Sequence, residues 1–272
     1  MNQTIVSIDW LFQHIGDPNL VILDASLKQN QANLKTNFSN LKIKGARFFD
    51  LKNIFSCQDS DLPNMVLSPQ YFALECQKLG INQDSTIVVY DNLGIYSSPR
   101  VWWMFQLMGH TNIAVLDGGL PAWVSALYPT EIYSADSTTY KLGNFITNYN
   151  AGWLVNQSQL TQHLSDTTAI IIDARKKARF WGKAPEPRPN LRSGHIQGSI
   201  NIPFTKVLHS GFFKEKEALL TLAQSSNLGK KRLIFSCGSG TTACILLLAF
   251  QTVLKNPMAL YDGSWSEWGI KN

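Results

Sequence analysis

Two kinds of hydrophobic stretch alternate along the chain. Short runs are apolar at consecutive positions and rich in β-branched residues, which is typical of buried parallel strands; they occupy residues 21–23, 87–90, 114–116, 170–172, 233–235 and 259–261. Longer amphipathic stretches lie between them. One opens with a capping serine, Ser68, followed by Pro69, and Pro99 is expected to begin or adjust another helix over residues 101–108. The alternation predicts an α/β protein whose parallel sheets are covered by helices on both faces.

Four sequence blocks occur twice and in the same order. The pairs are 21–26 with 170–175 (VILDAS and IIIDAR), 43–51 with 196–204, 86–98 with 232–244, and 115–123 with 260–268. Within these pairs Asp24 matches Asp173, Asp117 matches Asp262, and Asp91 matches Cys237. Because the spacing between partners is nearly constant, we infer a duplicated domain. The predicted domains span residues 1–139 and 153–272, and the loop-like composition of residues 140–152 predicts a linker between them.

Composition narrows the class of protein. With 44% hydrophobic and 16% charged residues, the chain has enough apolar content for packed cores, which excludes a disordered protein. Its four cysteines include no C-x-x-C pair, which argues against a disulfide scaffold and a structural zinc site. The longest strongly apolar run near the C-terminus, 243–250, is too short for a membrane span, and the first residues lack the features of a signal peptide. We therefore expect a cytoplasmic protein without a membrane-spanning segment.

Charge is distributed unevenly between the two predicted domains. Residues 1–139 hold 8 Lys or Arg and 12 Asp or Glu, whereas residues 140–272 hold 16 and 7. This asymmetry fits a second domain that handles anions, although a merely solvated basic face would look the same. The sequence shows neither a recognition helix nor an aromatic and basic platform, so we expect no nucleic-acid binding.

The strongest chemical signal is a cysteine between a strand and a helix. The apolar run 233–235 leads into Cys237 and a glycine-rich loop, which leads into the apolar stretch 243–250. Such a loop turns backbone N–H groups inward, and the following helix directs its positive end to the same place. This environment favours the thiolate form of cysteine, the nucleophilic one. The alternative is a buried cysteine at a strand end, which would not need the loop geometry that Gly238 and Gly240 supply.

The chain resembles the two-domain rhodanese-type sulfurtransferases over nearly its full length. The resemblance rests on YSSPRVWWMF (96–105), LDGGLPAW (116–123), SGHIQGSINIPF (193–204) and the Cys237 loop. It implies two tandem rhodanese-like domains, each a five-stranded parallel sheet flanked by helices. It also implies that the second domain carries sulfur as a persulfide on Cys237. The first domain would be inactive, because Asp91 stands where a cysteine would be needed.

The sequence of this loop differs between members of the family that use different substrates. The family's mercaptopyruvate-using members have Cys-Gly-Ser-Gly-Val-Thr, and its thiosulfate-using members have Cys-Arg-Lys-Gly-Val-Thr. The loop here is similar to the first, with Cys237 and Ser239 as implied catalytic residues; the implied substrate-binding residues are Gly238, Gly240, Thr241 and Thr242. The physical reason is that thiosulfate, a dianion, gains from cations on the loop. The resemblance implies a small anionic sulfur donor and a thiol acceptor such as thioredoxin; we expect no organic cofactor and no metal.

Two arginines are the candidate clamp for the substrate. By resemblance, Arg179 and Arg188 hold the substrate carboxylate and keto oxygen, a task that suits the planar fork of a guanidinium. Prolines 185, 187 and 189 stiffen the loop between them. Residues 175–192 contain seven Lys or Arg and one Glu, so charge alone would equally describe a solvated basic loop. Asp173 and Arg175 are expected to make structural contacts at the strand end.

One departure from the family concerns proton transfer. Relatives that use mercaptopyruvate are thought to employ a Ser-His-Asp relay whose histidine comes from the first domain. Lys42 occupies that place here, and no Asp or Glu lies between Asp24 and Asp50. Lys42 either stands in as a cation near the substrate or is solvent-exposed and unused in catalysis; we expect the second. The protonation of the leaving enolate is then unassigned. His195, in the matching block of the second domain, is expected to be structural and to bond to backbone.

The sequence leaves three alternatives to a sulfur transfer from mercaptopyruvate. A thiosulfate sulfurtransferase that uses cyanide or thiols is disfavoured by the neutral Gly238 and Ser239. A cysteine phosphatase would need an arginine six positions after the cysteine, where Ala243 stands. A non-catalytic binding protein of the same fold is compatible with the missing relay but not with the intact cysteine loop and both arginines.

Overall fold

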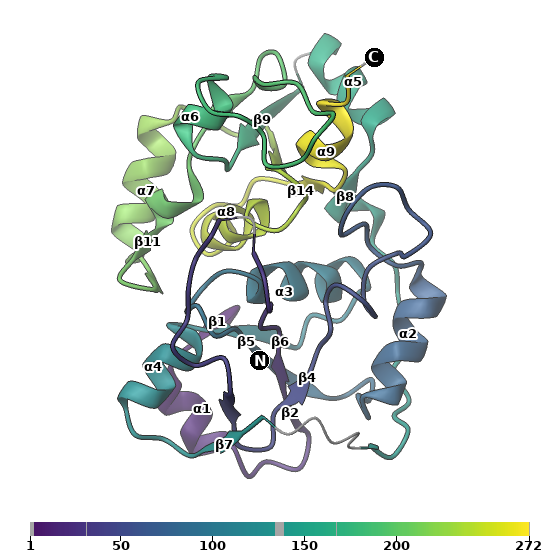
Figure 1. The fold of residues 1–272 in the computed structure, drawn as a ribbon, viewed down its shortest axis with the longest axis vertical. Coiled ribbons are helices and arrows are strands. Elements are labelled where there is room, and N and C mark those ends of the chain that lie inside the picture. The colour runs from purple at the N-terminus through teal and green to yellow at the C-terminus, as the bar shows by residue number, and fades with distance from the viewer. Residues whose placement is uncertain (1–2, 31, 134–138, 167, 272) are drawn as a thin grey trace. The chain divides into compact units, whose positions relative to one another are not determined.

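The chain forms two compact units in the computed structural model, which describes residues 3–30, 32–133, 139–166 and 168–271 (Figure 1). The first unit comprises Met1–Gln58, Val66–Asn150 and Ser210–Phe212. The second unit comprises Asp59–Met65, Ala151–His209 and Phe213–Asn272. Each unit therefore includes a short segment that lies, in sequence, within the other repeat. The repeat pattern does not predict that exchange.

A five-stranded parallel sheet forms the first unit. Its strands run in the order β1 (Ile5–Val6), β6 (Ile113–Leu116), β5 (Thr86–Tyr90), β2 (Leu20–Asp24) and β4 (Arg47–Phe48). The consecutive apolar positions that predicted β2, β5 and β6 are buried, because helices cover both faces of a parallel sheet. A separate antiparallel pair consists of β3 (Leu41–Ile43) and β7 (Thr130–Ile132).

The sequence predicted two of the helices of the first unit. The unit contains α1 (Ile8–His14), α2 (Pro69–Lys78), α3 (Ser98–Leu107) and α4 (Gly119–Ser125), and Figure 1 shows α1 beside α4. One of the predicted helices, α2, begins where the prediction placed it; α3 begins at Ser98, before the predicted residue 101. The Ser68 side chain caps α2 by accepting a hydrogen bond from the Tyr71 N–H. Pro99 lies in the first turn of α3, and every residue of that helix is buried.

The second unit repeats the sheet of the first. Its strands run in the order β10 (Ile200–Asn201), β9 (Ala169–Asp173), β13 (Arg232–Ser236), β14 (Met258–Tyr261) and β8 (Leu154–Val155), and all neighbours are parallel. The predicted α/β class with two parallel five-stranded sheets is therefore confirmed. The central strand, β13, is the one that leads to Cys237.

Helices flank this second sheet as well. They are α5 (Gln157–Asp166), α6 (Lys177–Phe180), α7 (Lys216–Ser225), α8 (Ala243–Gln251) and α9 (Ser264–Trp268). The unit also contains the 3-10 turns η1 (Ala151–Trp153) and η2 (Phe204–Val207), and the chain forms the short strands β11 (Leu208–His209) and β12 (Phe212–Phe213). The most apolar helix, α8, packs on β13 and β14. Among the helices that the structure describes, none is long and apolar enough to cross a membrane.

Each unit has its own hydrophobic core. In the first unit Trp123 packs with residues of β1, β2, β5 and β6, and in the second Trp265 packs with residues of β8, β9, β13 and β14. The tryptophans at 102, 103, 123 and 265 are buried, while Trp268 is partly buried against the second core. These cores hold the carboxyl ends of the strands, where the loops begin, in fixed positions.

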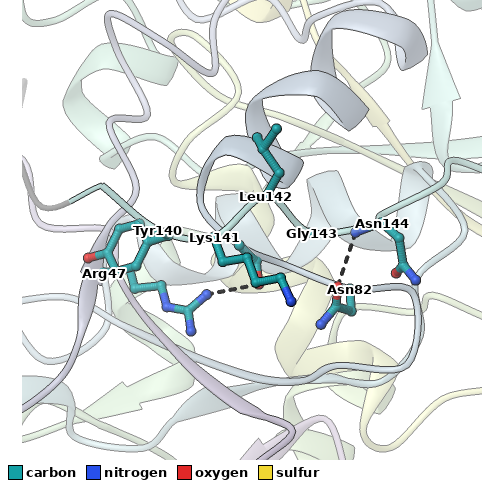
Figure 2. Close-up of a pocket in the computed structure, with 8 residues that line it drawn as sticks. Arg47, Asn82, Tyr140, Lys141, Leu142, Gly143 and Asn144 are labelled. Carbon is teal, nitrogen blue, oxygen red and sulfur yellow. Dashed lines mark hydrogen bonds between the residues drawn. The ribbon is translucent and has the colours of Figure 1, made fainter.

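The predicted linker, in its part 140–150, has no helix or strand and packs on the first unit. Phe145 is buried, and its N–H donates to the Ile81 carbonyl, while the Asn148 N–H donates to the Met108 carbonyl. The same stretch borders a pocket of about 370 Å³ (Figure 2), which is lined by Arg47, Gly80, Asn82, Tyr140, Lys141, Leu142, Gly143 and Asn144. This pocket contains none of the predicted site residues.

Candidate active site

Cys237 begins the loop between the central strand β13 and helix α8. The residue is 2% exposed, and Ser239 and Gly240 beside it are also buried. Gly240 has a φ of +75°, a left-handed conformation that favours glycine, so the predicted loop geometry is present. The helix starts at Ala243 without a side-chain cap, and its positive end therefore faces the loop.

The loop is anchored by Ser264, a residue that the sequence analysis missed. Its hydroxyl accepts hydrogen bonds from the backbone N–H groups of Cys237 and Gly240, both at 3.2 Å, and donates to the Tyr261 carbonyl at 2.9 Å. Ser264 is fully buried and has a φ of +50°. The repeat carries the signal that could have found it, because Gly119 occupies the equivalent position with a φ of +53°. A serine in a conformation that favours glycine indicates that its hydroxyl has a specific role.

Two backbone N–H groups of the predicted anion-binding loop, those of Cys237 and Gly240, are thus already hydrogen-bonded within the protein. The N–H groups of Gly238, Ser239, Thr241, Thr242 and Ala243 make no hydrogen bond to another residue in the part of the chain that the structure describes. Thr241 and Thr242 are half-buried at the start of α8. These five donors, rather than the whole loop, are available for an anion near Cys237.

Arg179 reaches the loop from α6. A Cβ atom at position 238 would lie 3.2 Å from Arg179 Nη2, so a side chain there would crowd this guanidinium. The arginine is held by Glu186, whose side chain is 1% exposed and accepts from Arg179 Nη2 at 2.6 Å and Nε at 3.2 Å. Sequence reasoning counted Glu186 only as the one acid of the basic loop and did not predict this pairing.

Glu186 also joins Arg179 to the end of β9. Its carboxylate accepts from Arg175 Nη1 at 2.9 Å, and Arg175 in turn donates to Asp173 at 2.6 Å. The guanidinium of Arg175 lies 4.5 Å from the centre of the Trp265 ring. The expected structural role of Asp173 and Arg175 is confirmed, because both are buried and paired.

Ser239 is contacted by the second predicted arginine. Arg188 Nη2 donates to Ser239 Oγ at 3.1 Å. Asn64, which belongs to the second unit, donates from Nδ2 to Ser239 Oγ at 2.9 Å and to the Ser239 carbonyl at 3.1 Å. The structure therefore brings the loop residues Cys237 to Gly240, Arg179 and Arg188 together, and adds Asn64, which sequence reasoning missed.

The expectation that Lys42 is solvent-exposed was wrong. Its side chain is 20% exposed, and Nζ lies 3.0 Å from Glu131 Oε1 and donates to the Ala46 carbonyl at 3.1 Å. The partner comes from the antiparallel pairing of β3 with β7, which sets Lys42 opposite Glu131. A carboxylate 89 positions later in the chain cannot be found by inspecting neighbouring residues.

The remaining candidates behave as structural groups. His195 Nδ1 lies 2.9 Å from the Phe180 carbonyl and its ring stacks on Phe180, so the predicted contact with backbone is confirmed. The Cys244 thiol is fully buried and donates to the Gly240 carbonyl at 3.1 Å. Burial raises the pKa of Cys76 well above its usual value, which keeps that thiol protonated. The described residues contain no group of three or more His, Cys, Asp or Glu that could hold a metal ion.

Asp91 occupies in the first unit the place that Cys237 occupies in the second. One oxygen of its buried carboxylate, Oδ2, accepts from the N–H groups of Tyr96, Ser97 and Ser98 at 2.8 to 2.9 Å and from the Ser98 hydroxyl at 2.7 Å. The other oxygen accepts from the Leu93 N–H at 3.0 Å. The loop and the start of α3 therefore bind an anion supplied by the chain itself.

Comparison with known proteins gives consistent results along the whole chain. The rhodanese-like domain pattern matches residues 7–126 and 156–271. The chain is 37% identical to the 3-mercaptopyruvate sulfurtransferase of Escherichia coli K12 over 98% of its length and 95% of that relative. It is also 37% identical to the mitochondrial thiosulfate/3-mercaptopyruvate sulfurtransferase 1 of Arabidopsis thaliana, over 99% and 77%. The crystal structure of SseA from Escherichia coli, a 3-mercaptopyruvate sulfotransferase, superposes with a TM-score of 0.84 at 35% identity, covering 98% of this chain and all of that one.

Proposed function

Because the chain belongs to the family of proteins built from rhodanese-like domains, we propose that it is a sulfurtransferase that uses 3-mercaptopyruvate. Cys237 takes the substrate sulfur as a persulfide and passes it to a thiol acceptor, and pyruvate is released. The observation that carries the substrate assignment is the packing of Arg179 against Gly238. An arginine at position 238, as in the thiosulfate-type loop, would place a second cation against Arg179. The neutral Gly238 and Ser239 instead leave room for a substrate whose carboxylate binds the arginines.

The proposed reaction begins with Cys237 as nucleophile, while the two arginines bind the substrate. The Cys237 thiolate attacks the sulfur of mercaptopyruvate, forming an S–S bond. The C–S bond breaks and leaves its electron pair on the substrate as the enolate of pyruvate. The proton of the substrate thiol ends on the enolate carbon, so pyruvate and a Cys237 perthiolate are the products. Arg179 and Arg188 bind the carboxylate and keto oxygen and stabilise the negative charge as it develops.

Asp91 supports the persulfide part of this proposal. Counted from Cα, the carboxylate oxygen of an aspartate is the third atom, which is also the position of the outer sulfur of a cysteine persulfide. By the repeat, the N–H groups of Tyr96 and Ser97 that bind Asp91 Oδ2 correspond to those of Thr242 and Ala243. In the second unit this place is available for an outer sulfur with negative charge. We therefore assign the loop N–H groups at the start of α8 to the perthiolate.

The acceptor is proposed to be a thiol, such as that of thioredoxin. Its thiolate attacks the outer sulfur of the perthiolate, which leaves the acceptor with the sulfur and regenerates Cys237. All four cysteines are free thiols in the structure. This state fits a reducing compartment, and we place the activity in the cytoplasm.

Intact-protein mass spectrometry tests the proposed function. After incubation with 3-mercaptopyruvate we expect the protein to gain the mass of one sulfur atom, because the perthiolate remains when no acceptor is present. The Cys237→Ser variant is the control and should gain none. A comparison of kcat/KM for mercaptopyruvate and thiosulfate completes the test. A higher value for thiosulfate would overturn the substrate assignment, and no sulfur gain with either donor would overturn the function.

We expect Lys42→Ala to change kcat by less than about tenfold, because Lys42 is paired with Glu131 and general acid–base catalysis is typically worth about 10²–10⁴-fold. The lost ion pair is partly exposed and should lower the free energy of unfolding by about 1 kcal/mol or less. Steady-state kinetics and thermal unfolding measure both effects, with Lys44→Ala, an exposed lysine, as control. A loss of several hundredfold at unchanged stability would show that Lys42 acts on the substrate.

A further inference from the structure

The orientation of the Asn64 side chain is fixed by the two atoms that it contacts. Its Nδ2 lies 3.1 Å from the Ser239 carbonyl and 2.9 Å from Ser239 Oγ. A backbone carbonyl only accepts hydrogen bonds, so the amide atom facing it must be the NH₂ group. Asn64 therefore donates to the hydroxyl of Ser239 and does not accept from it.

Arg188 occupies the other acceptor site of the same hydroxyl. Its Nη2 donates to Ser239 Oγ at 3.1 Å, and a guanidinium has no acceptor atom. A serine hydroxyl has two lone pairs and one proton, so Asn64 and Arg188 together use both lone pairs. The proton must point away from these two donors, and it has no acceptor among the residues that the structure describes.

From this arrangement we propose that Asn64 is a positioning residue that, with Arg188, makes the Ser239 hydroxyl a hydrogen-bond donor to the enolate of the departing pyruvate. The proposal rests on the proposed sulfur transfer and assigns the step that the absent histidine relay left open. In this step the C–S bonding pair moves onto the substrate as the enolate, and the Ser239 hydroxyl donates a hydrogen bond to the enolate oxygen. No net proton leaves Ser239, since the substrate thiol supplies the proton that completes pyruvate.

Two donors on one oxygen also exclude the opposite role for Ser239. A hydroxyl whose lone pairs are both occupied, one of them by a cation, is a poor base and a better donor. Ser239 consequently needs no histidine to remove its proton. Lys42, paired with Glu131 in the first unit, has no part in this proposal.

The decisive variant is Asn64→Asp, which keeps the shape of the side chain and reverses its hydrogen bonding. The carboxylate would accept the Ser239 proton, repel the Ser239 carbonyl and withdraw the donor from the enolate. A single donor to a developing oxyanion is worth about 10²–10³ in kcat, so Asn64→Asp should lower kcat by tenfold or more with a smaller change in KM. Asn64→Ala should lower kcat less than Asn64→Asp does, although it removes more of the side chain.

The control residue is Asn227, because it lies in the second unit and shares the left-handed backbone of Asn64, with a φ of +53° against +62°. Asn227→Asp should leave kcat and KM unchanged. In a Ser239→Ala background, Asn64→Asp should cost no further activity, since its effect acts through the missing hydroxyl. The double variant thus separates positioning from a general loss of structure, and thermal unfolding of each variant checks its fold.

Each outcome decides one question. If wild-type protein gains sulfur from mercaptopyruvate and Asn64→Asp retains its kcat, the role of Asn64 is overturned while the function stands. The same follows if the losses from Asn64→Asp and Ser239→Ala multiply in the double variant. If wild-type protein gains no sulfur from mercaptopyruvate, the proposed function fails first and this inference fails with it.

Discussion

Replacing Cys237 by alanine should abolish sulfur transfer from mercaptopyruvate to any acceptor. The Cys237 thiolate is the nucleophile that this chain supplies to the proposed reaction, and Cys237 stands between a central strand and the start of a helix. Activity should fall to the background rate of the assay. Because alanine leaves the loop backbone and its bonds to Ser264 in place, the midpoint of thermal unfolding should stay near that of the wild type.

Two further cysteines serve as controls for this prediction. Cys57→Ser changes a partly exposed thiol, and Cys76→Ala changes a buried thiol whose pKa is raised by burial. Both variants should retain sulfur transfer and the persulfide on Cys237. Loss of activity in either variant, with the protein still folded, would show that the assignment to Cys237 alone is wrong.

Replacing Arg188 by alanine should lower kcat/KM for mercaptopyruvate by about 30-fold to several thousandfold. This range corresponds to the loss of about 2–5 kcal/mol when one charged partner of a desolvated carboxylate is removed. Arg188 makes a hydrogen bond to the Ser239 side chain and is partly exposed, so the variant should melt close to the wild type. Steady-state kinetics with mercaptopyruvate, together with a thermal unfolding curve, measure the two effects.

Arg179→Ala should differ from Arg188→Ala in its effect on stability. The sequence led us to expect that both arginines serve binding alone, but Arg179 is also paired with the buried carboxylate of Glu186. Removing it leaves Glu186 with Arg175 as its remaining cation and should lower the free energy of unfolding by about 1–3 kcal/mol. An unchanged kcat/KM in both arginine variants would contradict the proposed clamp.

Much of the fold follows from local patterns that a sequence displays directly. The strands at 87–90 and 233–235 were predicted because buried parallel strands are apolar on both faces. Ser68 and Pro69 predicted the start of a helix, because helix capping depends on the first few residues alone. The glycine loop after Cys237 was predicted for the same reason, since a left-handed turn at Gly240 is a property of that residue.

The partners of the site residues could not be predicted in this way. Arg179 is held by Glu186, and the Cys237 loop is held by Ser264. Ser239 accepts a hydrogen bond from Asn64. Asn64 and Ser264 contact segments distant in the chain, and the pairing of Glu186 with Arg179, seven positions away, depends on how the loop between them folds. Lys42 shows the same limit, because the missing acid was sought nearby, whereas Glu131 lies on the opposite strand.

The amino-acid sequence is enough to show that this protein is a duplicated α/β chain with one cysteine loop in its second half and an aspartate in the matching place of its first. These features are encoded in local periodicity, in glycine and proline positions, and in the order of repeated blocks. The groups that surround that cysteine, and the direction of their hydrogen bonds, follow from the folded arrangement of the chain. The physical reason is that a hydrogen bond depends on the distance and direction between two atoms, and folding sets both for residues as far apart as Asn64 and Ser239.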